Sequence, residues 1–143
     1  MIKVLIVDDS LIARRNMEKF LKNLGCEVMD QAKNGVEAVE KAARLKPDLI
    51  TMDITMPDMD GIEAVKLIKQ NDANAKIIMA TSHGQEQMVL SSIKAGARGY
   101  MLKPVTQDKL QAVLEKTFPE LKQGFKARKS SSDDIEVLYS NDN

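Results

Sequence analysis

The chain has 143 residues, enough for one domain with a sizeable apolar core. Hydrophobic residues make up 43% of it and charged residues 29%, which is typical of a soluble globular protein and excludes an intrinsically disordered chain. The 21 basic and 21 acidic residues cancel. This balance argues against a dedicated nucleic-acid binder, because such proteins carry an excess of positive charge. The only cysteine, Cys26, excludes an internal disulfide, and we expect it to be a small buried residue.

Five short segments have the composition of β-strands. In chain order they are residues 2–7, 26–32, 49–52, 77–80 and 98–102. The first, third and fourth are nearly continuous in apolar residues, as in parallel strands that are buried on both faces. The second and fifth are weaker candidates.

Segments with helical periodicity lie between these strands. Two apolar stripes have the spacing i, i+3, i+4 and i+7 of an amphipathic helix; they are Met17, Phe20, Leu21, Leu24 and Gly61, Ala64, Val65, Ile68. The first stripe ends at Gly25, a residue typical of helix ends. Helix-start caps are predicted at Asn34 with Glu37, at Asp60 with Glu63, and at Thr106. The alternation predicts an α/β fold, a doubly wound parallel sheet of five βα units over residues 1–118.

Charged and hydroxyl residues follow four of the five predicted strands. Asp8 and Asp9 follow the first strand, Asp53 the third, Thr81 the fourth and Lys103 the fifth. In open parallel sheets, ligands bind at the carboxyl ends of the strands, so we expect these groups to converge there. Three carboxylates brought together would repel one another unless they bound a cation or took up protons. Mg²⁺ is the predicted ion, because it uses one or two carboxylates and leaves positions for phosphate oxygens.

A carboxylate beside a metal ion can act as a nucleophile and form an aspartyl-phosphate. Asp53 is the predicted acceptor. Phosphoryl transfer depends on positioning and on neutralisation of negative charge, so the ammonium group of Lys103 and the hydroxyl of Thr81 are expected to contact the transferred oxygens.

The same residues carry a resemblance to a known family. The pair Asp8-Asp9, Asp53 in the run DLITMDITMPDMDG, Thr81, Tyr100 and Lys103-Pro104 in GYMLKP resemble the receiver domains of two-component response regulators. The resemblance covers residues 1 to about 118. It implies a flavodoxin-like sheet with the strand order 2-1-3-4-5.

The resemblance also implies roles for individual residues. Asp9, Asp53 and the backbone carbonyl of Thr55 would bind Mg²⁺ directly, and Asp8 would act through a metal-bound water. Lys103 and Pro104 would be joined by a cis peptide bond. Tyr100 would turn inward after Thr81 as the switch responds. Thr55 and His83 would tune the rate at which the phosphate is lost.

As a receiver domain the chain would take a phosphoryl group from a sensor histidine kinase and catalyse its own phosphorylation and dephosphorylation. A protein target would bind the surface of the fourth helix, the fifth strand and the fifth helix, in or near which lie Met88, Lys94, Tyr100 and Lys109. The run MDITMP and the following MDG favour the stand-alone chemotaxis regulators, whose target is the flagellar motor switch. We expect a cytoplasmic monomer, with a phosphatase as a further partner and with no nucleic-acid or membrane contact.

Two other functions are compatible with the same residues. The chain could be a phosphorelay intermediate that passes its phosphate to a histidine phosphotransferase. It could also be an aspartate-nucleophile phosphatase of the haloacid dehalogenase type. That class has Asp-x-Asp after its first strand, whereas here Asp8 and Asp9 are adjacent and Thr55 occupies the place of the general acid after Asp53.

Residues 119–143 differ in composition from the rest of the chain. A basic segment is followed by a serine run and then by acidic residues. Such charge segregation predicts a flexible polar extension. Its 25 residues are too few for a DNA-binding output domain.

Overall fold

The computed structural model describes residues 1–121 and contains one parallel sheet with five main helices. The strands are β1 (Lys3–Val7), β2 (Glu27–Ala32), β3 (Leu49–Asp53), β4 (Ile77–Thr81) and β5 (Gly99–Leu102). The helices are α1 (Leu11–Asn23), α2 (Gly35–Leu45), α3 (Gly61–Asn71), α4 (Glu86–Ala95) and α5 (Gln107–Thr117), followed by a short 3₁₀ helix, η1 (Pro119–Leu121). The strand order is β2-β1-β3-β4-β5, which confirms the predicted fold. The predicted extension begins at residue 119, so η1 is its first part, and residues 122–143 lie outside the described residues.

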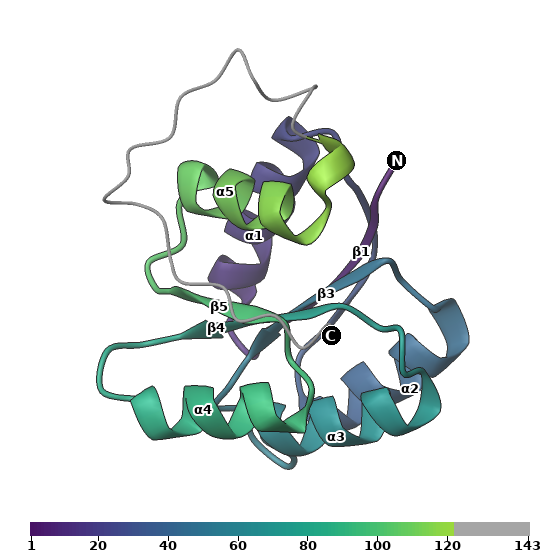
Figure 1. Cartoon of the computed structure of the whole chain (residues 1–143), viewed down its shortest axis with the longest axis vertical. Helices are drawn as coiled ribbons and strands as arrows, with labels where there is room; N and C mark the ends of the chain where they lie inside the picture. The colour runs from purple at the N-terminus through teal and green to yellow at the C-terminus, as the bar shows by residue number, and fades with distance from the viewer. Residues whose placement is uncertain (122–143) are drawn as a thin grey trace.

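Helices cover both faces of the sheet. In Figure 1, α1 and α5 lie on one face, and α2, α3 and α4 lie on the other. Successive residues of a strand point to opposite faces, so the buried strands supply two separate cores. In β1, Leu5 and Val7 belong to the core under α2, α3 and α4, whereas Val4 and Ile6 belong to the core under α1 and α5. Both cores are therefore built on the same nearly continuous apolar runs.

The two weaker strand predictions correspond to the two edges of the sheet. β2 pairs only with β1, and β5 pairs only with β4. Most side chains of β2 are half-buried, and those of β5 alternate between buried and half-buried. An edge strand has less surface to bury than a central strand, which explains the lower apolar content of these two segments.

The predicted helix ends are confirmed by their hydrogen bonds. The side chains of Asn34, Asp60 and Thr106 each accept a hydrogen bond from the backbone N–H three residues later. At the end of α1, Gly25 has a φ of +85°, in the left-handed region, and its N–H donates to the carbonyl of Lys22. The next N–H, of Cys26, donates to Leu21, and this pair of bonds is the Schellman arrangement that ends many helices.

The loop between β3 and α3 is packed closely against the carboxyl end of the sheet. The N–H of Gly61 donates to the carbonyl of Ile54 at 2.7 Å. A Cβ atom at Gly61 would overlap the backbone carbonyl oxygen of Asp53. The first turn of α3 can therefore approach the end of β3 only because residue 61 has no side chain. Within residues 1–121, none of the helices combines the length and the hydropathy needed to cross a membrane.

Candidate functional site

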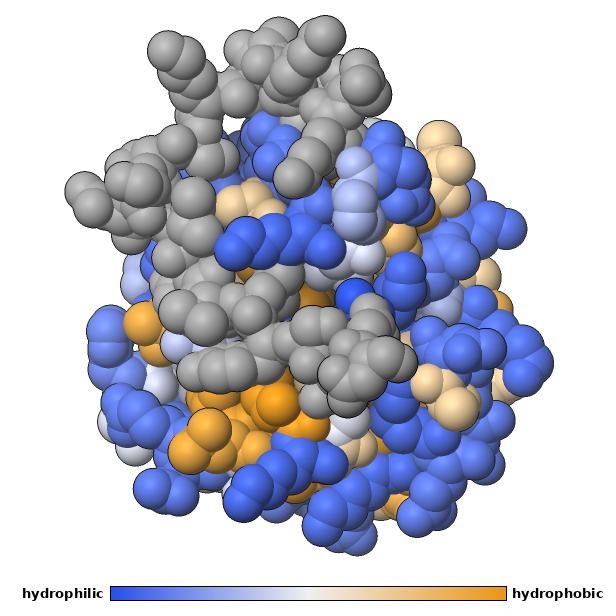
Figure 2. Space-filling view, viewed as in Figure 1, coloured by the Kyte–Doolittle hydropathy of each residue, from blue (hydrophilic) through white to orange (hydrophobic). Residues whose placement is uncertain are grey.

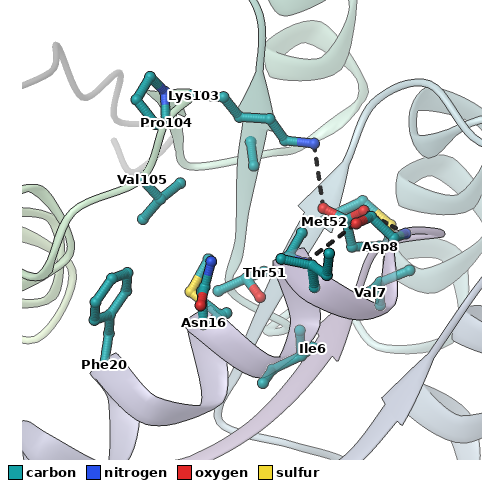
Figure 3. A pocket seen from close by; sticks show the side chains of 15 residues that line it. Ile6, Val7, Asp8, Asn16, Phe20, Thr51, Met52, Lys103, Pro104 and Val105 are labelled. Carbon is teal, nitrogen blue, oxygen red and sulfur yellow. Dashed lines mark hydrogen bonds and ion pairs between the residues drawn. The ribbon is translucent and has the colours of Figure 1, made fainter.

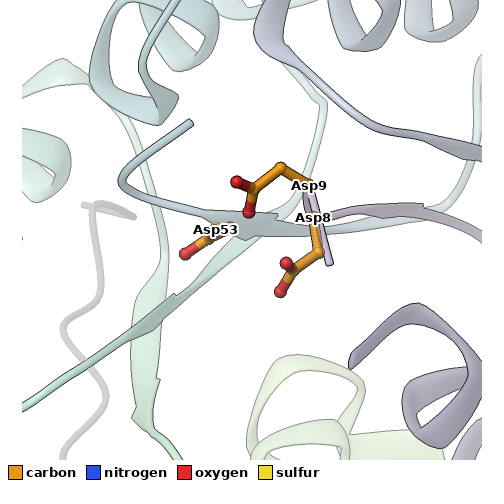
Figure 4. A group of neighbouring side chains, drawn as sticks. All are labelled: Asp8, Asp9 and Asp53. Carbon is orange, nitrogen blue, oxygen red and sulfur yellow. The ribbon is translucent and has the colours of Figure 1, made fainter. Parts of the chain in front are cut away.

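Three carboxylates meet at the carboxyl end of the sheet. Asp8 and Asp9 follow β1, and Asp53 is the last residue of β3, the strand that pairs with β1. One carboxylate oxygen from each lies within 4.8 Å of the others, and Figure 4 shows the three groups gathered at the ends of the two strands. Asp8 is 6% exposed and Asp53 7%, whereas Asp9 is open to solvent. The predicted convergence of these residues is thus present in the structure.

Lys103 connects two of these carboxylates. Its Nζ lies 3.2 Å from Asp8 Oδ2 and 3.1 Å from Asp53 Oδ1. Lys103 directly follows β5, and its backbone N–H donates to the carbonyl of Thr81 at 2.7 Å. The peptide bond to Pro104 is cis, as the resemblance implied. The second oxygen of Asp8, Oδ1, accepts a hydrogen bond from the N–H of Ser10 at 2.9 Å.

Burial and charge change the ionisation of this cluster. Burial, together with the negative charge of Asp8, raises the pKa of Asp53 to about 6, although Lys103 opposes the rise. For Lys103, burial alone would lower the pKa of the ammonium group, but the charges and hydrogen bonds of Asp53 and Asp8 outweigh it and the pKa is raised. Lys103 is therefore a cation at neutral pH, and Asp53 is a carboxylate that ionises less readily than an ordinary aspartate.

The donor atoms of the cluster are those of a site for a hard divalent cation. Three carboxylates face one ammonium group, so the ionised cluster carries an excess of negative charge in a largely buried place. Carboxylate oxygens from only two segments suit Mg²⁺, which keeps several of its waters, better than Ca²⁺, which takes six to eight oxygen ligands. The residues present therefore fit the predicted metal.

Thr81 lies beside the cluster, but its hydroxyl is engaged elsewhere. Thr81 is the last residue of β4 and is 1% exposed. Its Oγ1 donates a hydrogen bond to the side-chain oxygen Oε1 of Gln85 at 2.7 Å. The amide nitrogen of Gln85 donates in turn to the hydroxyl of Thr55 at 2.9 Å. The sequence prediction missed Gln85, which lies four positions after Thr81 and directly before α4, because its contacts depend on the path of the loop between β4 and α4.

Tyr100 and His83 lie where the sequence placed them. Tyr100, in β5, is half-buried and packs against the core beneath α4. With Thr81, Gln85 and Leu90 it lines a cavity of about 230 Å³ between α4 and β5. His83 lies on the loop before α4 and is exposed. Cys26 is buried, as predicted.

A second cavity, of about 250 Å³, opens beside the acidic cluster on the α1 and α5 side of the sheet. Figure 3 shows Asp8 and Lys103 at one end of this cavity and the apolar side chains of Phe20 and Val105 at the other. Thr51, from β3, lines it and is buried. The hydroxyl of Thr51 has no hydrogen-bond partner among the described residues.

The comparisons with known proteins agree with this geometry. The response regulator receiver domain family matches residues 4–115. The chain is similar to the chemotaxis protein CheY of Bacillus subtilis, with 48% identity over 115 residues that cover 80% of this chain and 96% of that protein. It is also similar to the CheY of Thermotoga maritima, with 47% identity over 114 residues that cover 80% of this chain and 95% of that protein.

Among solved structures, the chain is similar to a protein in the crystal structure of the CheX–CheY–BeF₃–Mg²⁺ complex from Borrelia burgdorferi. The TM-score is 0.78 with 35% identity, and the match covers 82% of this chain and 89% of that one. The receiver domain of AraT from Geobacillus stearothermophilus is also similar, with a TM-score of 0.77 and 30% identity over 86% of this chain and 97% of that one. The likeness therefore extends from sequence to fold.

Proposed function

Since the chain belongs to the response regulator receiver domain family of two-component systems, we propose that it accepts a phosphoryl group on Asp53 and signals through the resulting change of shape. The chain is a CheY-like receiver domain, which is consistent with a role in chemotaxis. One observation carries the proposal. The carboxylate of Asp53 is buried, hydrogen-bonded to Lys103 and grouped with two further carboxylates.

Mg²⁺ is the proposed cofactor. Asp9, Asp53 and the backbone carbonyl of Thr55 would hold it directly, and Asp8 would hold it through water. When bound, the ion would neutralise negative charge on the group being transferred. Lys103 would provide the other positive charge, and it is already within 3.1 Å of the acceptor carboxylate.

The proposed reaction forms one bond and breaks another at phosphorus. A carboxylate oxygen of Asp53 attacks the phosphoryl group of a phosphohistidine on the kinase, and the phosphorus–nitrogen bond breaks. The histidine nitrogen leaves with the bonding pair and takes a proton from solvent. The product is an acyl phosphate on Asp53, and hydrolysis of its phosphorus–oxygen bond later returns the free carboxylate.

The signal would follow from new hydrogen bonds to the phosphoryl oxygens. Thr81 would rotate to donate its hydroxyl, and Tyr100 would move inward behind it. A hydrogen bond to a charged group contributes about 1.5 to 3 kcal/mol. A switch from 1:99 to 99:1 needs about 5.5 kcal/mol. Two such bonds, from Thr81 and Lys103, would approach this value only in part, because both groups already have partners in the resting state. A bound target would supply the remainder.

We assign target binding to the surface of α4, β5 and α5, with the flagellar motor switch as the target and a sensor histidine kinase as the phosphoryl donor, in the cytoplasm. Figure 2 shows apolar surface near the position of α4, and Leu90 of that helix is 45% exposed. The alternative is a phosphorelay intermediate. Mixing the phosphorylated protein with a flagellar switch peptide and with a histidine phosphotransferase distinguishes the two.

Substitution of the acceptor tests the proposal. Asp53→Asn should abolish labelling by acetyl phosphate, because an amide oxygen is a poor nucleophile, while the circular dichroism spectrum stays that of the wild type. Intact-mass spectrometry measures the label. Asp58→Asn is the matched control, because Asp58 is exposed on the neighbouring loop, and it should be labelled at the wild-type level. Full labelling of Asp53→Asn, or undiminished wild-type labelling in a chelator, would contradict the proposal.

A further inference from the structure

The side chain of Gln85 joins two segments that flank the acidic cluster. Its Oε1 accepts hydrogen bonds from the hydroxyl of Thr81 at 2.7 Å and from the N–H of Ser82 at 2.8 Å. Its Nε2 donates to the hydroxyl of Thr55 at 2.9 Å. Gln85 occupies the position just before α4, yet its side chain makes no hydrogen bond that caps this helix. The amide is therefore used to hold the end of β4 to the loop after β3.

The bond to Gln85 engages the one proton that Thr81 can donate. Thr81 is 1% exposed, so water cannot readily replace a lost partner. The other acceptor near this hydroxyl, the carbonyl oxygen of Ser82, lies 3.4 Å away, which is long for a hydroxyl donor. A hydroxyl that donates to Gln85 cannot donate the same proton to an oxygen on Asp53. The hydrogen bond from Thr81 to Gln85 and a hydrogen bond from Thr81 to a group on Asp53 therefore exclude each other.

We propose that Gln85 is a positioning residue that latches the resting conformation and sets how readily Thr81 turns toward a phosphorylated Asp53. This inference rests on the proposed function. The amide also contacts Met88 Sδ at 3.8 Å and lines the cavity beneath α4 together with Tyr100. Release of Thr81 would remove one of the hydrogen bonds that hold Gln85 directly before α4, and this would link the acidic cluster to the position of that helix.

Removal of the amide should make the active conformation easier to reach. The resting state of Gln85→Ala leaves the buried hydroxyl of Thr81 without its acceptor, whereas the activated state keeps its bond to the phosphoryl mimic. Beryllofluoride with Mg²⁺ is the probe, and its half-saturating concentration is measured by backbone amide NMR. We expect half-saturation of Gln85→Ala at a roughly three- to tenfold lower concentration than wild type, the range that one hydrogen bond supports.

Further variants separate the proposed effect of Gln85 on the resting conformation from a general loss of stability. Gln85→Met keeps the length of the side chain without the amide and should behave as Gln85→Ala does. Gln87→Ala removes an exposed glutamine two positions along α4 and should match the wild type. In a Thr81→Ala background, Gln85→Ala should no longer change beryllofluoride binding, because no hydroxyl is left to release.

The outcomes distinguish this inference from the function on which it rests. Wild-type protein that binds no beryllofluoride would overturn the proposed function and the latch with it. If the wild type binds beryllofluoride but Gln85→Ala and Gln85→Met are half-saturated at the same concentration as the wild type, the latch alone would be overturned. An undiminished effect of Gln85→Ala in the Thr81→Ala background would also overturn it.

Discussion

The ionisation of Asp53 is governed by two opposed influences. Burial and the charge of Asp8 favour the neutral acid, whereas Lys103 favours the carboxylate, and the balance leaves a pKa of about 6. At neutral pH the residue is therefore ionised, and it keeps a negative charge that costs the folded state free energy. A bound cation would relieve this cost, because it would neutralise the charges of Asp53, Asp8 and Asp9 together.

A pH dependence of stability follows from this pKa. The folded state holds the Asp53 proton up to a pH of about 6, whereas an unfolded aspartate loses it near 3.9. The stability that this group provides below pH 4 is therefore lost as the pH rises to about 6. Between pH 4 and pH 7 in a chelating buffer, the free energy of unfolding should fall by roughly 1 to 3 kcal/mol more in the wild type than in Asp53→Asn.

Urea unfolding at several pH values measures this difference. Asp58→Asn serves as the control and should keep the wild-type slope, because Asp58 lies on the exposed loop. The same slope in Asp53→Asn as in the wild type would contradict the assignment of a raised pKa to Asp53.

At the level of single residues, the sequence predicted the positions of the charged groups of the site but not the contacts of the Gln85 side chain. Asp8, Asp9, Asp53 and Lys103 each stand next to a strand end, and the rule that parallel strands end at one edge brings them together. Gln85 makes its contacts through the path of the loop between β4 and α4. That path depends on Gly84, whose φ is +90°, and on packing that no local pattern in the sequence encodes.

Individual elements depend on close contacts at their ends. The start of α3 lies against the end of β3, where a Cβ atom on Gly61 would overlap the Asp53 carbonyl. Gly61→Ala should therefore shift α3 and lower the free energy of unfolding by about 1 to 3 kcal/mol, as overpacked sites do. Thermal unfolding measures the loss. Leu11→Ala, at the half-exposed first position of α1, is the control and should change stability by about 0.5 kcal/mol or less.

A backbone shift at Gly61 would also move Asp53. Labelling by acetyl phosphate should accordingly fall in Gly61→Ala even at temperatures where the variant is folded. Wild-type stability and labelling in this variant would show that α3 has more room than the structure indicates.

The existence of each element was easier to predict than its exact bounds. The buried strands β1, β3 and β4 have continuous apolar runs, and each was predicted to within one residue at either end. The second strand was predicted from residue 26 and begins at Glu27, because Cys26 still belongs to the turn that ends α1. Local hydrogen bonds decide such boundaries, and hydrophobic pattern alone does not contain them.

For the whole molecule, the acidic cluster exists only in the folded chain. Asp9 and Asp53 are 44 positions apart and meet because β1 pairs with β3. Mg²⁺ should therefore bind the folded state in preference to the unfolded state. At a concentration tenfold above its dissociation constant, it should raise the free energy of unfolding by about 1.4 kcal/mol. For a domain of this size the midpoint of thermal unfolding should rise by roughly 3 to 5 °C.

Differential scanning calorimetry in MgCl₂ and in NaCl of equal ionic strength tests this expectation. Asp9→Asn should lose most of the rise without harm to the fold, because Asp9 is exposed. A rise of equal size in NaCl, or in Asp9→Asn, would mean that the stabilisation comes from general screening of charge and not from this cluster.

Each charged group of the acidic site comes from the end of a strand or from the residues directly after it, and none comes from the outward face of a helix. The acidic cluster and the outward faces of the helices are thus encoded by different parts of the chain. Under the proposed function, replacement of residues on the surface of α4, β5 and α5 would change the protein target while the acidic cluster stays the same. In this way one fold would serve many separate signalling pathways, each kept specific by the side chains on its binding surface.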